Sequence, residues 1–317
     1  MATVTLRSGP KVRILLGKGG VGKTLVSSAL ARALADQGAQ TLLVELDGRP
    51  EIARHFDLEG PLPQADTLLY QSSAGGSVIG RHVAADDALL NYLDGHGMKS
   101  VSRRLHKSGL VDLIAGSIPG FRDVLVLGQV KQFANRDDID SVVVDGPATG
   151  HALTLLTSPI GLARVARAGP VKEQAEKVSV LLRDKNCCGI VLVTTPEELP
   201  ISETIEAAFR IEDEADVALE FVVANRVHAD LAQEALEQLS AIEAEIGNPA
   251  LTVQLREAFA FAFARCEAER PELERLRREL PLPLWILPAL DAVSAETEMV
   301  AHLSQVLGAI KTPVEPA

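Results

Sequence analysis

The chain has little cysteine, and its cysteines are poorly placed for metal or redox chemistry. Cys187 and Cys188 are adjacent, and Cys266 stands alone. None of the three has the two-residue spacing of a zinc-binding or redox-active pair. We therefore interpret them as small, buried apolar residues.

Basic residues are outnumbered as well. The chain has 31 Lys and Arg against 43 Asp and Glu, which gives a formal net charge of −12. A protein of this charge does not present a broad surface to nucleic acid or to anionic membranes. We expect no nucleic-acid partner.

Long hydrophobic runs are also missing. No uninterrupted apolar run approaches the roughly 20 residues that span a bilayer, and Met1–Pro10 has no apolar core of signal-peptide length. The stretch Ala295–Lys311 has apolar residues at helical spacing, but Glu296 and Glu298 outweigh Lys311, which is the wrong polar face for a membrane-surface helix. We predict a cytoplasmic protein without stable membrane insertion, whose last helix docks on the domain.

One glycine-rich stretch carries the strongest functional signal. Gly17-Lys18-Gly19-Gly20-Val21-Gly22-Lys23-Thr24 follows the apolar run Val12–Leu16 and precedes the helical pattern Leu25–Asp36. Strand, glycine-rich loop and helix in this order form a phosphate-binding loop, in which backbone N–H groups converge on phosphate oxygens. We predict that Gly17 to Leu25 bind ATP or ADP, that Lys23 reaches the β- and γ-phosphates, and that the Thr24 hydroxyl binds Mg²⁺.

The alternation of apolar runs and helical patterns predicts the fold. The predicted strands are Val12–Leu16, Thr41–Leu46, Ser141–Val144, Gly189–Thr194, Glu220–Ala224 and Leu284–Leu287, and the predicted helices are Leu25–Asp36, Asp86–Ala115, Val124–Ala134, Ala163–Arg183, Ile201–Glu214, Ala229–Ile246 and Leu251–Leu280. This order is typical of an α/β fold with a doubly wound, mostly parallel sheet. We predict one domain over residues 1–317, with a helical insertion at about 66–137 and additional helices at about 151–185 and 228–280.

Two acidic residues follow predicted strands, at the edge of the sheet where ligands bind. We predict that Asp145 supports Mg²⁺ through a water molecule and that the Gly146 N–H approaches the γ-phosphate; the alternative for Asp145 is a helix cap. Asp47 is a candidate for the metal site and for orienting the attacking water. A turn-forming Asp47-Gly48 is the alternative.

The loop resembles that of the deviant phosphate-loop ATPases, which include ParA and MinD, the nitrogenase iron protein and the arsenical-pump (ArsA) ATPases. Their extra lysine, here Lys18, crosses a dimer interface to the partner's nucleotide. Since the loop occurs once in this chain, the resemblance implies a dimer with a second copy or a related chain, in which Lys18 is catalytic together with Lys23 and Asp47. A solvated loop lysine is the alternative.

Four further segments resemble the arsenical-pump and tail-anchored-protein-targeting branch. They are Asp47–Phe56, Ser117–Asp123, Asp145–His151, and Thr195–Glu197 with Ser202–Thr204. The resemblance implies that Asn225 and Pro288 bind adenine, although a loop-capping Asn225 is an alternative. The family's zinc-bridging and metalloid-binding cysteines have no counterpart here, so we expect no zinc site, no arsenite site and no iron–sulfur cluster.

Members of this branch bind apolar client helices beside the switch segments, where this chain has spare helices. The candidates are Leu89, Leu90, Leu93, Leu110, Leu113, Ile114, Leu125 and Leu127. With only three methionines in the chain, an adaptable Met-lined groove is not indicated, and we favour core packing for these residues. We also favour burial for Phe259, Phe261 and Phe263; an exposed Phe261 would mark a contact surface.

The sequence thus predicts an ArsA-like ATPase that binds ATP, hydrolyses it with Mg²⁺, and opens and closes as a dimer to capture or regulate a protein client. Gly48-Arg49-Pro50 and Pro147-Ala148 depart from the family's switch motifs. One alternative is therefore a non-hydrolysing, nucleotide-bound regulatory subunit of a heterodimer with a related ATPase. Another is a positioning ATPase similar to ParA and MinD.

Overall fold

The computed structural model describes residues 6–46, 50–95, 97–108, 118–228, 248–290 and 295–310. Its centre is an eight-stranded sheet in the order β3-β4-β2-β5-β1-β6-β7-β8. The strands are β1 (Val12–Gly17), β2 (Gln40–Glu45), β3 (Thr67–Gln71), β4 (Ser77–His82), β5 (Ser141–Ala148), β6 (Cys188–Thr194), β7 (Leu219–Val227) and β8 (Leu284–Pro288). All neighbours pair in parallel except β3 and β4. The predicted mostly parallel sheet is confirmed.

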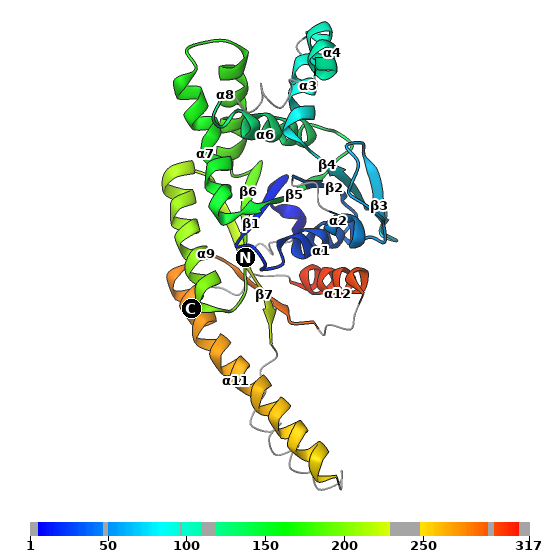
Figure 1. Ribbon diagram of the computed structural model, residues 1–317, viewed down its shortest axis with the longest axis vertical. Coiled ribbons are helices and arrows are strands. Elements are labelled where there is room, and N and C mark those ends of the chain that lie inside the picture. The colour runs from blue at the N-terminus through cyan, green and yellow to red at the C-terminus, as the bar shows by residue number, and fades with distance from the viewer. Residues whose placement is uncertain are drawn as a thin grey trace.

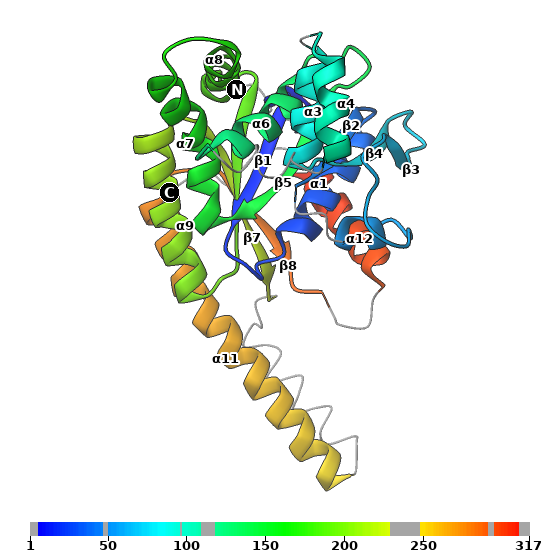
Figure 2. The same cartoon turned by 45° about the horizontal axis from the view of Figure 1, so that its top comes forward.

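Helices cover both faces of the sheet, as a doubly wound fold requires (Figures 1 and 2). The helices are α1 (Lys23–Asp36), α2 (Glu51–Arg54), α3 (Ala85–Gly95), α4 (Lys99–Ser108), α6 (Phe121–Ala134), α7 (Thr149–Val165), α8 (Pro170–Arg183), α9 (Glu198–Arg210), α11 (Pro249–Glu279) and α12 (Glu296–Ala309), with a 3-10 turn η1 (Leu6–Ser8) and a π turn η2 (Ile211–Ala215). One core cluster packs α1 and α12 against the sheet, and the other packs α6 to α9 against the opposite face.

All six predicted strands are present because their apolar runs are buried from both sides. Every residue of β1 and β6 is buried. The only charged side chain within β1 is Arg13, whose guanidinium forms a bidentate pair with Glu220 of β7, at 2.9 Å for both Nε–Oε2 and Nη2–Oε1. Burial of an arginine is tolerated here because its donors are paired.

Helix α12 docks on the domain, as we predicted from the acidic residues of its polar face, which do not suit a membrane surface. Val300, Leu303 and Leu307 are at most 1% exposed, and Leu303 and Leu307 belong to the cluster that contains α1. Within the described ranges, no helix has the length and apolar character needed to cross a bilayer.

The segment expected to be a helical insertion begins instead with two strands. β3 and β4 form one end of the sheet, and we did not predict them because β3 has no buried residue and β4 carries Ser77, Gly80 and Arg81 among its apolar residues. The helical part starts at α3. There Leu89, Leu93, Leu125 and Leu127 are buried and Leu90 is partly buried, which confirms core packing, whereas Leu110, Leu113 and Ile114 lie outside the described residues.

The helix predicted over Ala163–Arg183 is wrong as one element. α7 ends at Val165, and α8 begins at Pro170 after Gly169, whose φ is 99°. Proline has no N–H to continue a helix and disfavours helical geometry in the residue before it. The two helices are therefore separate, and they pack side by side (Figure 1).

Helix α11 extends well beyond the sheet (Figures 1 and 2). Its buried side chains, such as Leu273 and Leu276, lie near its C-terminal end, while Phe261 in the protruding part is 70% exposed. Our prediction of burial is therefore wrong for Phe261, and Phe259 and Phe263 are only partly buried, because this part of the helix lies away from the layers of the domain. The predicted helix Ala229–Ile246 lies outside the described residues.

The base of α11 is anchored at two points. Glu269, which is 5% exposed, accepts from the backbone N of His228 at 2.9 Å, and its other oxygen lies 2.6 Å from His228 Nδ1. Arg275 Nη2 donates to Ser202 Oγ of α9 at 3.1 Å. The helix is thus tied both to the end of β7 and to α9.

The cysteines behave as structural residues. Cys188 and Cys266 are buried, and Cys187 is half-buried. Burial raises the pKa of Cys188 to about 12, which keeps this thiol protonated and unreactive at neutral pH.

Candidate functional site

The loop Gly17–Thr24 joins β1 to α1 and forms an open cradle. Gly20 and Gly22 have φ of 92° and 86°, in the left-handed region that glycine adopts readily. A Cβ at Gly19 or Gly20 would meet no described atom within 4 Å, and no described side chain caps the first turn of α1. Uncapped N–H groups at a helix N-terminus next to open space form an anion-binding site.

Two side chains of β7 donate hydrogen bonds to backbone carbonyls of this loop. Asn225, 1% exposed, donates from Nδ2 to the Val21 carbonyl at 2.9 Å, and Arg226 donates from Nη1 to the Gly20 carbonyl at 3.1 Å. A Cβ on Gly22 would collide with the Asn225 amide. The sequence placed Asn225 beside adenine, whereas in this structure its amide nitrogen holds the loop; sequence reasoning did not identify Arg226.

Two hydroxyls of α1 converge on Asp145. Thr24 Oγ1 donates to Asp145 Oδ2 at 2.8 Å, and Ser27 Oγ donates to Asp145 Oδ1 at 2.9 Å. The structure thus brings Thr24 and Asp145 together, as the sequence anticipated. We missed Ser27, although its position three residues after Thr24 places it on the same helix face.

Of the other predicted residues, Gly146 and Pro288 lie on strands of the same sheet. Gly146 lies on β5, where an added Cβ would press against the Leu15 carbonyl of β1, so glycine permits the close packing of these strands. Pro288 of β8 pairs with Val227, two residues beyond Asn225. Asp47 lies outside the described residues, which resume at Pro50 after Leu46.

Both lysines of the loop have partners in their own chain. Lys23 Nζ lies 3.3 Å from the Lys18 carbonyl, which it donates to. Lys18 Nζ forms an ion pair with Glu203 Oε1 of α9 at 2.7 Å. Thr195–Glu197 forms the loop after β6, whereas Ser202–Thr204 lies within α9. Sequence reasoning gave Glu203 no role, because no local pattern reveals a contact across 185 positions.

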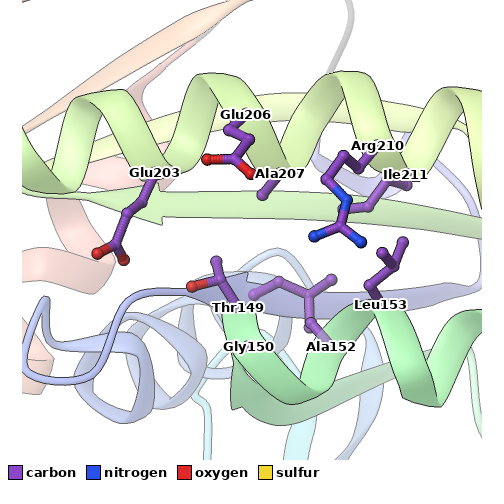
Figure 3. A pocket seen from close by; sticks show the side chains of 10 residues that line it. Thr149, Gly150, Ala152, Leu153, Glu203, Glu206, Ala207, Arg210 and Ile211 are labelled. Carbon is purple, nitrogen blue, oxygen red and sulfur yellow. The ribbon is translucent and has the colours of Figure 1, made fainter.

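Two cavities are lined in part by α7. One of about 270 Å³ lies between α7 and α9, where Thr149 and Gly150 face Glu203, Glu206 and Arg210 (Figure 3). The other, of about 710 Å³, lies where β2, β4 and β5 end. It is lined by Leu46, His82, Val83, Ala84, Ala85, Arg122, Asp123, Val126, Pro147, Ala148, His151 and Leu155.

Helix α2 follows the undescribed residues 47–49 and rests on α1 through a buried histidine. His55, 7% exposed, has Nδ1 2.8 Å from Ser28 Oγ. Burial is the main cause that lowers the pKa of His55, which favours its neutral form.

These residues fit a nucleotide with Mg²⁺. The cradle supplies backbone donors and a lysine for phosphate, and Thr24 with Asp145 supplies a hydroxyl and a carboxylate, the hard oxygen ligands that Mg²⁺ prefers. The arrangement is suited to binding a polyphosphate and stabilising charge on it.

Comparison with known proteins supports this assignment. The family model described as "Anion-transporting ATPase" matches residues 11–168 and 165–248. ATPase BagA of Mycobacterium tuberculosis is 37% identical over 228 residues, which cover 69% of this chain and 66% of that protein. ATPase GET3C of Arabidopsis thaliana is 24% identical over 250 residues, 64% of each chain.

A third relative is named an arsenical pump-driving ATPase. This putative protein of Halobacterium salinarum is 26% identical over 223 residues, which cover 66% of this chain and 34% of that protein. The match to the family model extends over most of the chain and includes the cradle, Asp145 and Asn225. The chain belongs to the anion-transporting (ArsA-type) ATPase family.

Proposed function

We propose that this protein binds ATP with Mg²⁺ and hydrolyses it. The observation that carries the proposal is the open cradle Gly17–Thr24 next to the Thr24, Ser27 and Asp145 network. Thr24 and Asp145 would hold Mg²⁺, which supplies charge neutralisation on the phosphates when bound. The family match and the similarity to several proteins named ATPases support the same activity.

Each remaining residue has a proposed role in this site. Lys23, at the start of α1, stabilises charge on the β- and γ-phosphates, and the Gly146 N–H senses the γ-phosphate. Asp47 orients the attacking water. Asn225 braces the loop through its amide nitrogen, and its amide oxygen with the backbone around Pro288 recognises adenine.

We propose further that the active form is a dimer with a second copy or a related chain. Lys18 lies within the loop with its side chain 28% exposed, so it is accessible to a nucleotide across an interface. A cation supplied in this way acts like an arginine finger, which accelerates phosphoryl transfer by about 10³–10⁵.

Steady-state phosphate release tests the enzyme proposal. Lys23→Ala should abolish turnover, while Lys185→Ala, at an exposed lysine outside the site, should leave it unchanged. No Lys23-dependent turnover, either alone or with a related chain, would refute hydrolysis and favour the non-hydrolysing regulatory subunit. Lys18→Ala should lower turnover without loss of ATP binding.

We propose that nucleotide-driven opening and closing serves a protein client. Leu89, Leu93, Leu125 and Leu127 are buried in the core, whereas α11 exposes Leu251, Val253 and Phe261. Trapping the ATP state with Asp47→Asn and identifying the proteins that co-purify would test this role. ATP-induced binding to liposomes or DNA at physiological salt, with no client recovered, would instead favour a positioning ATPase.

A further inference from the structure

The ion pair between Lys18 and Glu203 ties the loop to α9 within one chain. The Nζ–Oε1 distance is 2.7 Å, and the two side chains are 28% and 35% exposed. Because Lys18 is the residue proposed to cross a dimer interface, this contact holds it in the wrong place for that task.

The position of Glu203 does not depend on Lys18. The preceding residue, Ser202, accepts from Arg275 of α11, and Thr204 Oγ1 donates to the Pro200 carbonyl within α9. The helix therefore presents the Glu203 carboxylate from a fixed scaffold.

Lys18 is the basic residue that forms an ion pair with Glu203 among the described residues. Glu206 and Arg210 line the same cavity one and two turns farther along α9 (Figure 3). Arg210 already pairs with Glu214, at 2.9 Å for Nε–Oε1. Glu206 adds a second negative charge on the same side of the helix.

We propose that Glu203 is a positioning residue that retains Lys18 in its own subunit and so opposes dimer closure until nucleotide is bound. This inference rests on the proposed nucleotide-dependent dimer. In a symmetric dimer both subunits must release Lys18, so the contact is lost twice. Half-exposed ion pairs change an equilibrium by a factor of about 1.4 to 5 each, and two of them by about 2- to 30-fold.

The test measures self-association of the full chain by sedimentation with Mg²⁺ and a non-hydrolysable ATP analogue. Glu203→Gln should associate about 2- to 30-fold more tightly than wild type. Glu206→Gln, on the same helix and in the same cavity, should match wild type, and Glu203→Asp should move back toward it. The gain should shrink at high ionic strength, because salt screens half-exposed charges.

A second measurement does not need the dimer. Amine acylation of the nucleotide-free protein, read by peptide mass spectrometry, should modify Lys18 faster in Glu203→Gln than in wild type or Glu206→Gln. Equal Lys18 labelling overturns the inference and leaves the proposed function intact.

The outcomes separate the two proposals. Nucleotide-dependent association that is equal in wild type and Glu203→Gln overturns the role of Glu203 alone. Tighter association by Glu206→Gln to the same extent overturns it as well, because the effect is then one of general charge. If no variant associates, the dimer with a second copy is refuted, and the role of Glu203 in its closure with it.

Discussion

Alanine substitution at three glycines of the loop should separate backbone strain from steric collision. Gly19 has an ordinary φ and open space around it, Gly20 has a φ of 92° and open space, and Gly22 has a φ of 86° and the Asn225 amide where a Cβ would lie. The three positions therefore form a graded series within one motif.

The expected losses follow from these environments. Gly19→Ala should change the free energy of unfolding by less than about 1 kcal/mol, toward greater stability, because it restricts the unfolded chain. Gly20→Ala should lose about 1–2 kcal/mol to left-handed strain. Gly22→Ala should lose this amount and a further 1–3 kcal/mol, roughly, since the displaced Asn225 amide leaves a buried partner unsatisfied.

Urea unfolding of the nucleotide-free protein, followed by circular dichroism, measures the series. In a double-mutant cycle, Asn225→Ala should reduce the cost of Gly22→Ala, because it removes the colliding group. If Gly22→Ala costs no more than Gly20→Ala, or if the cycle is additive, the brace from β7 does not constrain the loop.

Three further predictions concern charged and titratable groups. Glu220→Gln should lower the free energy of unfolding by about 3 kcal/mol, because it leaves Arg13 buried without its carboxylate. Urea unfolding measures this loss, with Glu214→Gln, which removes the carboxylate of an exposed ion pair, as the control. An equally small loss in both variants would contradict the prediction. Asp145→Asn should weaken ATP binding at least about tenfold with Mg²⁺ and much less in EDTA by calorimetry; equal losses in both conditions would argue against a metal role. Since the fold lowers the pKa of His55 below 6.5, the unfolded chain binds more protons, so stability is fully present above pH 6.5 and falls as the pH drops below it. Urea unfolding between pH 5 and 8 should show this slope in wild type and a smaller one in His55→Asn.

The sequence predicted the parallel core and the loop because both leave local signals. Continuous apolar runs identify strands buried on both faces, and glycine spacing identifies the cradle. β3 and β4 left no such signal, since β3 has no buried residue and β4 includes serine, glycine and arginine. The break at Gly169-Pro170 has a local signal, because this dipeptide is typical of a turn, and the predicted helix Ala163–Arg183 did not take it into account.

The site was less predictable because its contacts are long-range. Thr24 and Asp145 were expected together, since both follow strands that end at one edge of the sheet. The partners of Lys18 and Val21, Glu203 and Asn225, come from elements about 200 positions away, and their contacts depend on how α9 and β7 are placed in three dimensions. The exposure of Phe261 likewise depends on where α11 leaves the domain, which helical periodicity does not specify.

Because α11 is anchored at its base, a small tilt of the helix there would produce a larger displacement at its far tip. At 31 residues the helix is about 46 Å long, and Glu269 fastens it to His228, two residues beyond the arginine that contacts Gly20. Since the helix begins at Pro249, a tilt of about 5° at this fulcrum would carry the far tip, roughly 30 Å away, through about 2.6 Å. A displacement of the loop too small to resolve at its origin would thus become measurable at the tip, for example as a change in distance between a spin label there and one on the sheet.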